Sequence, residues 1–243
     1  KSPPEISVQN AWSKEKVRAE VKRCRDLGIA LIPKLNFSTC HNLWMHDYYY
    51  MVSSQPYYQV CSDLINEVYD MFDKPEYIHL GMDEEDYETA GQYYEYVCYR
   101  TKSALVKDLR FLFDEVKKTG AKPWIWADPL LKNPELYMEN FTPDDALLSP
   151  WYYSAFKREH STPIQVWCDV YQGGKDCRET ERYKQGYRYM EDLPSHVEFR
   201  EKAHTYMEKG YKVVSECIDL SHEGLGLEDT GNEPKYEQKG FLE

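Results

Sequence analysis

The sequence predicts an α/β fold in which helices alternate with parallel strands, as in a (β/α)8 TIM barrel or a partial, truncated version of one. Three observations lead to this prediction. Helical patterns, with apolar residues every three or four positions, alternate along the chain with short apolar runs. These runs are continuously apolar, which is typical of strands in parallel sheets. Each run ends in acidic, amide or aromatic residues, where such folds bind their ligands.

The first elements are expected in the order helix, strand, helix. Apolar residues recur at helical spacing after Ser13, a good N-cap, and Gly28 ends the pattern. The apolar run 29–33 then predicts a fully buried strand. Pro56 fits the first turn of a second helix, and Pro75 stops it.

The next elements repeat this alternation. The run 77–80 predicts a strand, and acidic residues follow it directly. The longest helical pattern covers about residues 92–118 and closes at Gly120. Two further apolar runs, near residues 123 and 146, predict the next strands.

We interpret the 243 residues as one domain. Residues 154–192 exceed an ordinary connection and are expected to form a long insertion or a lid, and residues 221–243 a C-terminal extension. A helix ending near Gly210 is expected to lead into a strand over residues 211–219. Because only about five strands are visible, we expect a partial barrel or a piece of one.

Composition limits the classes of partner. The net charge of −12, from 42 acids against 30 bases, argues against nucleic acid or an anionic membrane surface. No apolar run approaches the length of a membrane span. The seven cysteines contain no CxxC pair and are expected to be mostly buried thiols. Location and oligomeric state stay open.

Aromatic residues point to a different kind of ligand. The chain has 22 Tyr and six Trp, several of them at expected strand ends. Sugars stack their apolar faces on aromatic rings while their hydroxyls bond to polar tips, so this enrichment suits a glycan cleft. Ordinary packing is the alternative for any single ring.

Two consecutive carboxylates, Asp83 and Glu84, follow the expected strand at residues 77–80. Neighbouring side chains of an extended chain point to opposite faces, so we expect the two acids in different surroundings. Carboxylates in different surroundings can divide the roles of proton donor and electrostatic stabiliser. The alternative is that they only cap a helix.

The pattern His79-x-Gly81-x-Asp83-Glu84 resembles the His-x-Gly-(Gly/Ala)-Asp-Glu signature of the family 20 glycoside hydrolases, the β-N-acetylhexosaminidases, with Met82 at the usually small position. The resemblance implies a barrel enzyme that hydrolyses N-acetylhexosamine-containing glycans with retention. Glu84 would be the general acid and base. Asp83 would orient the substrate's own 2-acetamido group, which attacks the anomeric carbon. His79 would buttress the acids, or be a satisfied core histidine.

An earlier segment, residues 33–41, resembles the family's Pro-Glu-x-Asp-x-Pro-Gly-His stretch. Lys34 stands in place of the Glu and Asn36 in place of the Asp, while His41 comes one residue late. By this resemblance Asn36 and His41 would contact the substrate. Farther along, Ile218 precedes an acid where the family has a Tyr.

The remaining substrate contacts are expected at two later strand ends. Trp126 would form a wall of the sugar site and Asp128 would bind a hydroxyl, with core packing and capping as the alternatives. Trp151 and Tyr152 are expected to complete the wall. We expect no cofactor and no metal site, because the His and Asp residues of the loop after residue 41 follow no metal-ligand spacing.

Two other functions stay open. The chain could be a carbohydrate-binding barrel without turnover, as Lys34 and Asn36 suggest. It could also be a glycosidase of other specificity that pairs Glu84 with a second carboxylate such as Asp128.

Overall fold

The computed structural model describes residues 3–7, 10–87, 91, 97–150 and 205–213. The chain divides into two compact units, one of residues 1–149 with 210–212 and the other of residues 150–209 with 213–243. The central sheet and the helices around it belong to the first unit. In the second unit the structure describes Pro150, Val213 and residues 205–209, of which 205–208 are helical. Among all described residues, no helix combines the length and the apolarity needed to cross a membrane.

A parallel sheet lies at the centre of the first unit, as predicted. Its strands are β1 (Tyr77–His79), β2 (Lys122–Trp126) and β3 (Leu147–Ser149), in that order and all parallel. The three predicted strands in these regions are therefore confirmed. Helices connect them along the chain, so the α/β class with parallel strands is confirmed as well.

Two further segments lie against the outer strands of this sheet. Residues 33–37 run along the free edge of β1, where the Leu35 amide donates to the His79 carbonyl at 2.7 Å. Along β3, the Leu148 amide donates to the Lys212 carbonyl at 3.0 Å. The spatial order of all five segments thus follows their order in the chain.

The first of these segments corrects the strand predicted at residues 29–33. Ile29 is 53% exposed and Ile32 is 37% exposed, so this run is not buried. Pairing begins only at Pro33, whose carbonyl accepts from the His79 amide at 2.9 Å. Apolar character alone does not set the position of a strand, and the residues that pair are those that alternate between apolar and polar.

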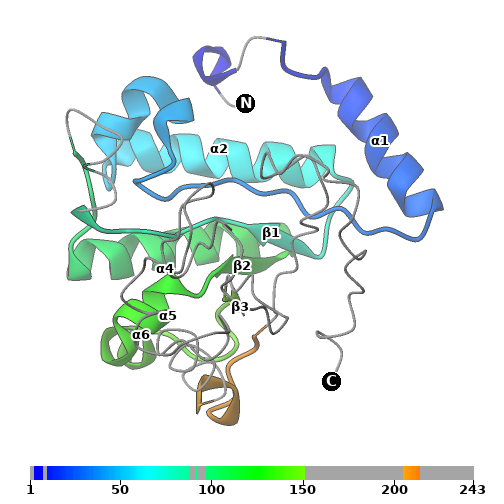
Figure 1. Cartoon of the computed structure of the whole chain (residues 1–243). Helices are drawn as coiled ribbons and strands as arrows, with labels where there is room; N and C mark the ends of the chain where they lie inside the picture. The colour runs from blue at the N-terminus through cyan, green and yellow to red at the C-terminus, as the bar shows by residue number, and fades with distance from the viewer. Residues whose placement is uncertain (1–2, 8–9, 88–90, 92–96, 151–204, 214–243) are drawn as a thin grey trace, which may run out of the picture. The chain divides into compact units, whose positions relative to one another are not determined.

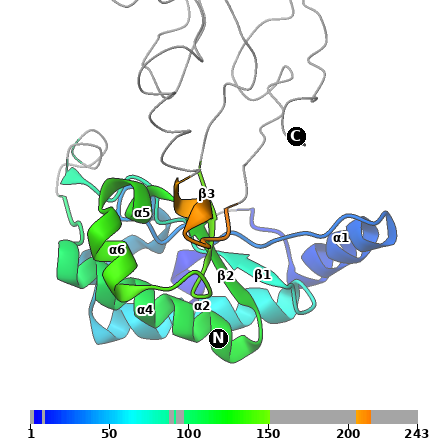
Figure 2. The ribbon, with the colours of Figure 1, turned by 90° about the horizontal axis from the view of Figure 1, so that it is seen from below.

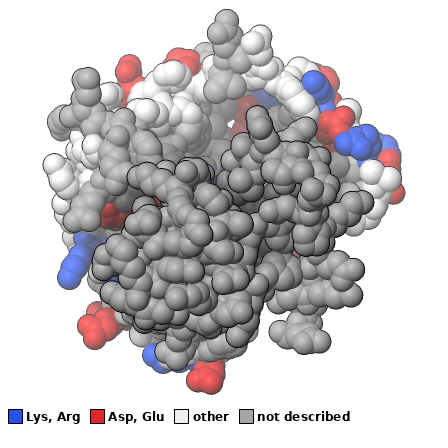
Figure 3. Space-filling model, viewed as in Figure 1, with Lys and Arg blue, Asp and Glu red and all other residues white. Residues whose placement is uncertain are grey.

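Helix α1 (Lys14–Asp26) forms as predicted, with Ser13 Oγ accepting from the Lys16 amide at 3.2 Å. The helix ends before Gly28, which has φ +78°. Of its residues only Val21 is buried, and in Figure 1 it lies away from α4, at the edge of the unit. Side chains of both charge signs stand side by side at this edge in Figure 3.

Helix α2 (Gln55–Met71) also forms as predicted, with Ser54 as its N-cap and Pro56 in its first turn. A one-turn 3-10 helix η1 (Pro4–Ile6) and the longer η2 (Leu43–Met51) precede it. The buried face of α2 includes Tyr57, Val60, Cys61, Leu64 and Ile65. This face packs on η2 and α4 and so joins the core.

Helix α4 (Lys102–Thr119) is shorter than predicted, because it begins at Lys102 and not near Gln92. Residues 97–101 are not helical, and residues 92–96 lie outside the described ranges. The reason is tertiary: Arg100 is fully enclosed and bonded to three other segments. Gly120 ends the helix in the left-handed conformation, as predicted.

Helices α2 and α4 lie on the same face of the sheet (Figure 2). Strand alternation directs Ile78, Ile125 and Leu148 towards them, and all three are wholly buried. Two short helices, α5 (Asp128–Lys132) and α6 (Pro134–Asn140), follow β2.

The other face of the sheet carries a row of different character. Lys34 pairs with His79, His79 with Trp124, and Trp124 with Leu147, so these side chains share that face. Trp126, two residues beyond Trp124, follows on the same side. This face leads directly into the acidic residues after β1.

Several predictions fall on residues that the structure does not describe. These are the insertion at 154–192, the C-terminal extension at 221–243, the strand beyond residue 213, and the wall residues Trp151 and Tyr152.

Candidate active site

The backbone leaves the extended conformation directly after β1. Gly81, Met82 and Glu84 have φ values of +78°, +72° and +52°. The expectation that neighbouring acids point to opposite faces therefore fails here, because it assumes an extended chain. Instead, Asp83 Oδ2 and Glu84 Oε2 both contact His41 Nε2, at 3.2 and 2.9 Å.

A glycine is needed at the start of this turn. A Cβ atom on Gly81 would lie 2.0 Å from Asn36 Oδ1. The close approach lets Asn36 Nδ2 donate to Asp83 Oδ1 at 3.2 Å, while Asn36 Oδ1 accepts from the Ser38 amide at 3.1 Å. Asn36 thus holds one oxygen of Asp83 and His41 the other.

The segment that carries Asn36 and His41 also fixes the backbone of the acids. The Ser38 hydroxyl donates to the Asp83 carbonyl, and the Cys40 thiol donates to the Glu84 carbonyl. Burial raises the pKa of the Cys40 thiol to about 12, which keeps it a donor. The turn is therefore held by side chains from a segment more than 40 positions away.

His41 carries a positive charge in this arrangement. Hydrogen bonds to Asp83 and then to Glu84 raise the pKa of His41 to about 10, against the effect of partial burial. For Asp83, burial favours the neutral acid, but the hydrogen bond and charge of His41 outweigh it and the pKa is lowered. At neutral pH the imidazolium of His41 thus contacts both Asp83 and Glu84.

His79 is the opposite case. Its Nδ1 accepts from the Gly81 amide at 3.0 Å, so the neutral ring carries its proton on Nε2. Burial, with the charge of Lys34 second, lowers the pKa of His79 to about 3. The ring lies 5.5 Å from that of Trp124 and 5.0 Å from that of Trp126.

Asp128 meets the acids through the backbone. Its Oδ1 accepts from the Glu84 amide at 3.1 Å and lies 4.0 Å from Lys132 Nζ. Asp128 is 4% exposed and Trp126 6% exposed. Of the predicted site residues that the structure describes, Asn36, His41 and Asp128 contact the two acids directly, while His79 acts through Gly81 and Trp126 lies against His79.

Glu85 belongs to a separate ion network that the sequence analysis missed. Its Oε1 lies 2.5 Å from Arg100 Nη1, and Arg100 Nε lies 2.5 Å from Asp108 Oδ2. Thr39 donates to both oxygens of Glu85, at 2.8 and 2.9 Å. The available sequence signal was an arginine 15 positions after Glu85 in an acid-rich stretch, but it says nothing about which acid Arg100 reaches.

The three groups around His41 Nε2 have the geometry of a possible cation site. Ligand atoms of His41, Asp83 and Glu84 lie within 4.8 Å of one another. Among the described residues, these three side chains form the group of His, Cys, Asp or Glu residues that could hold a metal ion. A divalent cation would have to displace the proton on His41 Nε2, the atom that contacts both acids. The geometry thus admits a metal without requiring one.

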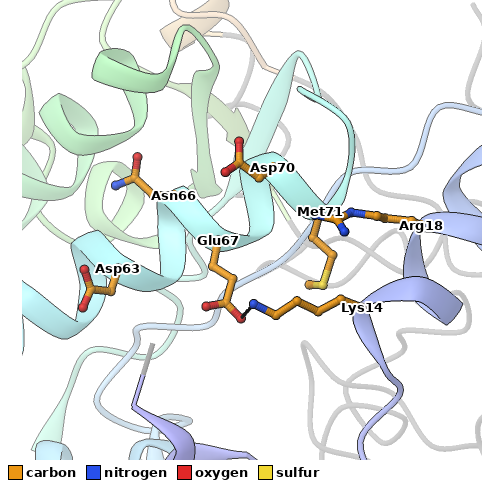
Figure 4. A pocket seen from close by; sticks show the side chains of 7 residues that line it. All are labelled: Lys14, Arg18, Asp63, Asn66, Glu67, Asp70 and Met71. Atoms are coloured by element: carbon orange, nitrogen blue, oxygen red, sulfur yellow. Dashed lines mark ion pairs between the residues drawn. The ribbon is translucent and has the colours of Figure 1, made fainter. Parts of the chain in front are cut away.

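A hollow of about 300 Å³ lies elsewhere, between α1 and α2 (Figure 4). Lys14 and Arg18 line it on one side, and Asp63, Glu67 and Asp70 on the other. Lys14 Nζ pairs with Glu67 at 2.8 Å across it. Because charges of both signs compensate each other there, this hollow selects no ligand charge.

Comparison with known proteins gives matches among solved structures only, since no family model and no curated protein matches the chain. A chitobiase of glycoside hydrolase family 20 from Flavobacterium johnsoniae is 18% identical, with a TM-score of 0.44 over 58% of this chain and 24% of that one. A family 20 exo-β-N-acetylglucosaminidase from Vibrio harveyi is 15% identical, with a TM-score of 0.43 over 59% of this chain and 26% of that one.

A third match is a β-N-acetylhexosaminidase from Bacteroides fragilis, 15% identical, with a TM-score of 0.42 over 84% of this chain and 58% of that one. The chain thus spans between 24% and 58% of the length of these three proteins. The first two of these proteins are described as members of glycoside hydrolase family 20, the family whose signature residues 79–84 resemble.

Proposed function

We propose that this chain carries the catalytic centre of a glycoside hydrolase that acts on N-acetylhexosamine-containing glycans. The observation that carries the proposal is the convergence of Asp83 and Glu84 on His41 Nε2, at 3.2 and 2.9 Å, where β1 ends. Their side chains are 17% and 28% exposed, so both are sheltered and still reachable by a ligand. The signature at residues 79–84 supplies the substrate class.

In the proposed reaction the substrate's acetamido oxygen attacks the anomeric carbon, while Glu84 gives its proton to the leaving oxygen. Asp83 orients the acetamido group and stabilises the positive charge that develops on it. Water then attacks the anomeric carbon of the cyclic intermediate and gives a proton to Glu84, which restores the acid, while the acetamido group is released. The greater exposure of Glu84 suits proton exchange, and the two fixed oxygens of Asp83 suit orientation.

His41, Asn36 and Asp128 are positioning residues in this proposal. Asn36 and His41 each bond one oxygen of Asp83. Asp128 accepts from the Glu84 amide and so helps to hold the turn on which Glu84 stands. A preorganised site of this kind lowers the barrier because few groups must reorient during the reaction.

We further propose that the parallel segments form part of a (β/α)8 barrel within one domain. The order 33–37, β1, β2, β3 and 212 agrees with the sequential strand order of such a barrel. The acids then lie at the carboxyl end of a strand, where barrel enzymes place their active sites. Trp126, with Trp151 and Tyr152, would enclose the sugar.

The test is Glu84→Gln, assayed with 4-nitrophenyl N-acetyl-β-glucosaminide. We expect kcat to fall by about 10²–10⁴-fold, because the amide cannot transfer the proton, with little change in Tm. Glu76→Gln is the matched control, since Glu76 is 65% exposed and forms an ion pair with the exposed Lys122. A folded Glu84→Gln variant with wild-type kcat would refute the proposal.

The second candidate is a carbohydrate-binding barrel without turnover. Asn36 favours it, because an amide at the position of the family's acid bonds Asp83 but brings no negative charge. Binding of N-acetylglucosamine by the wild-type chain, with no hydrolysis of any aryl glycoside, would support it. A glycosidase that pairs Glu84 with Asp128 is less favoured, since Asp128 is buried and bonded to the Glu84 amide; cleavage of glycosides without a 2-acetamido group would support it.

A further inference from the structure

Hydrogen-bond donors gather on the sheet face that lies opposite α2 and α4. Lys34 Nζ lies 4.5 Å from the centre of the Trp126 ring. The His79 ring is 5.0 Å from the same indole. Lys34 and His79 are paired neighbours on adjacent segments, so the three side chains form one group.

These donors have no acceptor among the residues that the structure describes. Trp126 Nε1 is buried and makes no hydrogen bond there, and the same holds for Trp124 Nε1. His79 uses Nδ1 to accept from Gly81, which leaves its Nε2 proton as a further donor. Within the described part of the chain, Lys34 contacts the face of Trp126 and forms no ion pair with a carboxylate.

An unsatisfied buried N–H is costly and therefore rare in native proteins. The two indole N–H groups and the neighbouring Lys34 ammonium are therefore a cluster of donors without an acceptor among the described residues. Asp83 and Glu84 form hydrogen bonds with Asn36 and His41 instead. The positive charge of Lys34 also acts across this face, since after burial it is the second cause that lowers the pKa of His79.

We propose that Lys34, together with the Trp126 indole N–H, binds an anionic substituent, a sulfate ester or a carboxylate, on the amino sugar that Asp83 and Glu84 contact. A neutral hydroxyl could accept from the indole only, whereas an anion could also pair with the ammonium of Lys34, which is exposed to solvent. A charged acceptor satisfies both donors at once and gains the stronger, charge-assisted hydrogen bond.

The location agrees with this assignment. Lys34 lies two residues before Asn36 on the same segment, so both side chains project from the same face. Asn36 bonds Asp83, so Lys34 is two residues away from a side chain that contacts one of the acids. The inference rests on the proposed function only in placing the sugar at these acids, since the donors are present whatever the chain catalyses.

The test measures binding by calorimetry, apart from any turnover. The ligands are N-acetylglucosamine, its 6-sulfate, and a disaccharide of glucuronic acid and N-acetylglucosamine. For the wild-type chain we expect at least one of the two anionic ligands to bind about 10-fold or more tightly than the neutral sugar. That advantage should shrink as the salt concentration rises, and which ligand shows it distinguishes sulfate from carboxylate.

Lys34→Met keeps the length of the side chain and removes its charge, and we expect it to abolish the preference while leaving affinity for the neutral sugar unchanged. Lys22→Met is the control, because Lys22 is exposed on α1 and pairs with Asp26. Trp126→Phe keeps the ring and removes the N–H, and should reduce the preference in part. If Lys34→Met fails to fold, the salt dependence of the wild-type chain still decides.

The outcomes separate this inference from the proposed function. Equal affinity of the wild-type chain for neutral and anionic ligands overturns the inference, whether or not glycosides are cleaved. A preference for anions that Lys34→Met retains also overturns it. A preference that depends on Lys34, in a chain that cleaves no 2-acetamido glycoside, supports the inference and contradicts the proposed hydrolase.

Discussion

Three consecutive acids, Asp83, Glu84 and Glu85, belong to two clusters of opposite character. Glu85 is 4% exposed and meets Arg100, whose side chain is wholly buried. Asp83 and Glu84 are 17% and 28% exposed and meet His41, which is 33% exposed. The comparison teaches that exposure and the kind of cation separate a structural acid from a candidate catalytic one, although all three follow the same strand.

The two cations differ in what they allow. Arg100 uses its donors on Glu85, Asp108, the Phe37 carbonyl and the Tyr57 hydroxyl, so the cluster is closed. Arginine also keeps its charge throughout the range in which proteins fold. His41 can lose its proton and is reachable by a ligand, so its cluster can rearrange when a substrate arrives.

The largest expected effect comes from Glu85→Gln. Glu85→Gln removes one charged partner of a buried arginine and leaves Arg100 with Asp108, and we expect a loss of about 3–5 kcal/mol of unfolding free energy. Urea unfolding of the variant beside Glu84→Gln measures the difference, and the Glu84 variant should stay within about 1 kcal/mol of wild type. A larger loss of stability in Glu84→Gln than in Glu85→Gln would contradict this distinction between the two clusters.

Gly81→Ala is expected to disturb the candidate catalytic cluster and leave the Arg100 cluster intact. The new Cβ would lie 2.0 Å from Asn36 Oδ1, at a φ of +78°. We expect a loss of about 1–3 kcal/mol from strain, with a larger relative fall in activity because Asn36 and Asp83 must move.

Gly28→Ala is the matched control for that variant. Its φ is also +78°, but nothing lies within 4 Å of the added Cβ. Only the backbone strain remains, so the loss should be smaller and activity unchanged. Equal losses of stability and activity in both variants would show that the contact with Asn36 has no consequence.

The smallest expected effect is the pH dependence of stability. The pKa of His41 is raised from 6.5 to about 10, so its contribution is fully present below pH 6.5 and is lost as pH rises towards 10. The Arg100 cluster should not change in this window. Thermal unfolding of wild type and His41→Gln between pH 6 and 10 checks this, and parallel curves would contradict the assigned role of His41.

The lowered pKa of His79 predicts that stability depends on pH in the opposite direction at acid pH. Its pKa is lowered from 6.5 to about 3, so protons bind more readily to the unfolded chain between these values. Stability should therefore fall as pH decreases from 6.5 towards 3. In His79→Gln, the part of that slope which comes from His79 should disappear.

Local patterns made much of the fold predictable. The cap at Ser13, the proline in the first turn of α2 and the glycine after α4 all mark helix ends correctly, because each acts on backbone groups within one turn. Two predictions were wrong: the strand at residues 29–33 and the start of the long helix near residue 92. Both errors concern segments whose conformation depends on distant partners, β1 in one case and the Arg100 cluster in the other.

The sequence by itself determined that helices alternate with parallel strands and that acids follow β1, since apolar period and chain order suffice for both. Only the tertiary structure decided which acid is enclosed by Arg100 and which two meet His41. His41 and Glu84 are 43 positions apart, and Asn36 and Asp83 are 47 apart. Contacts over such separations depend on how whole elements pack, and no local pattern of residues encodes them.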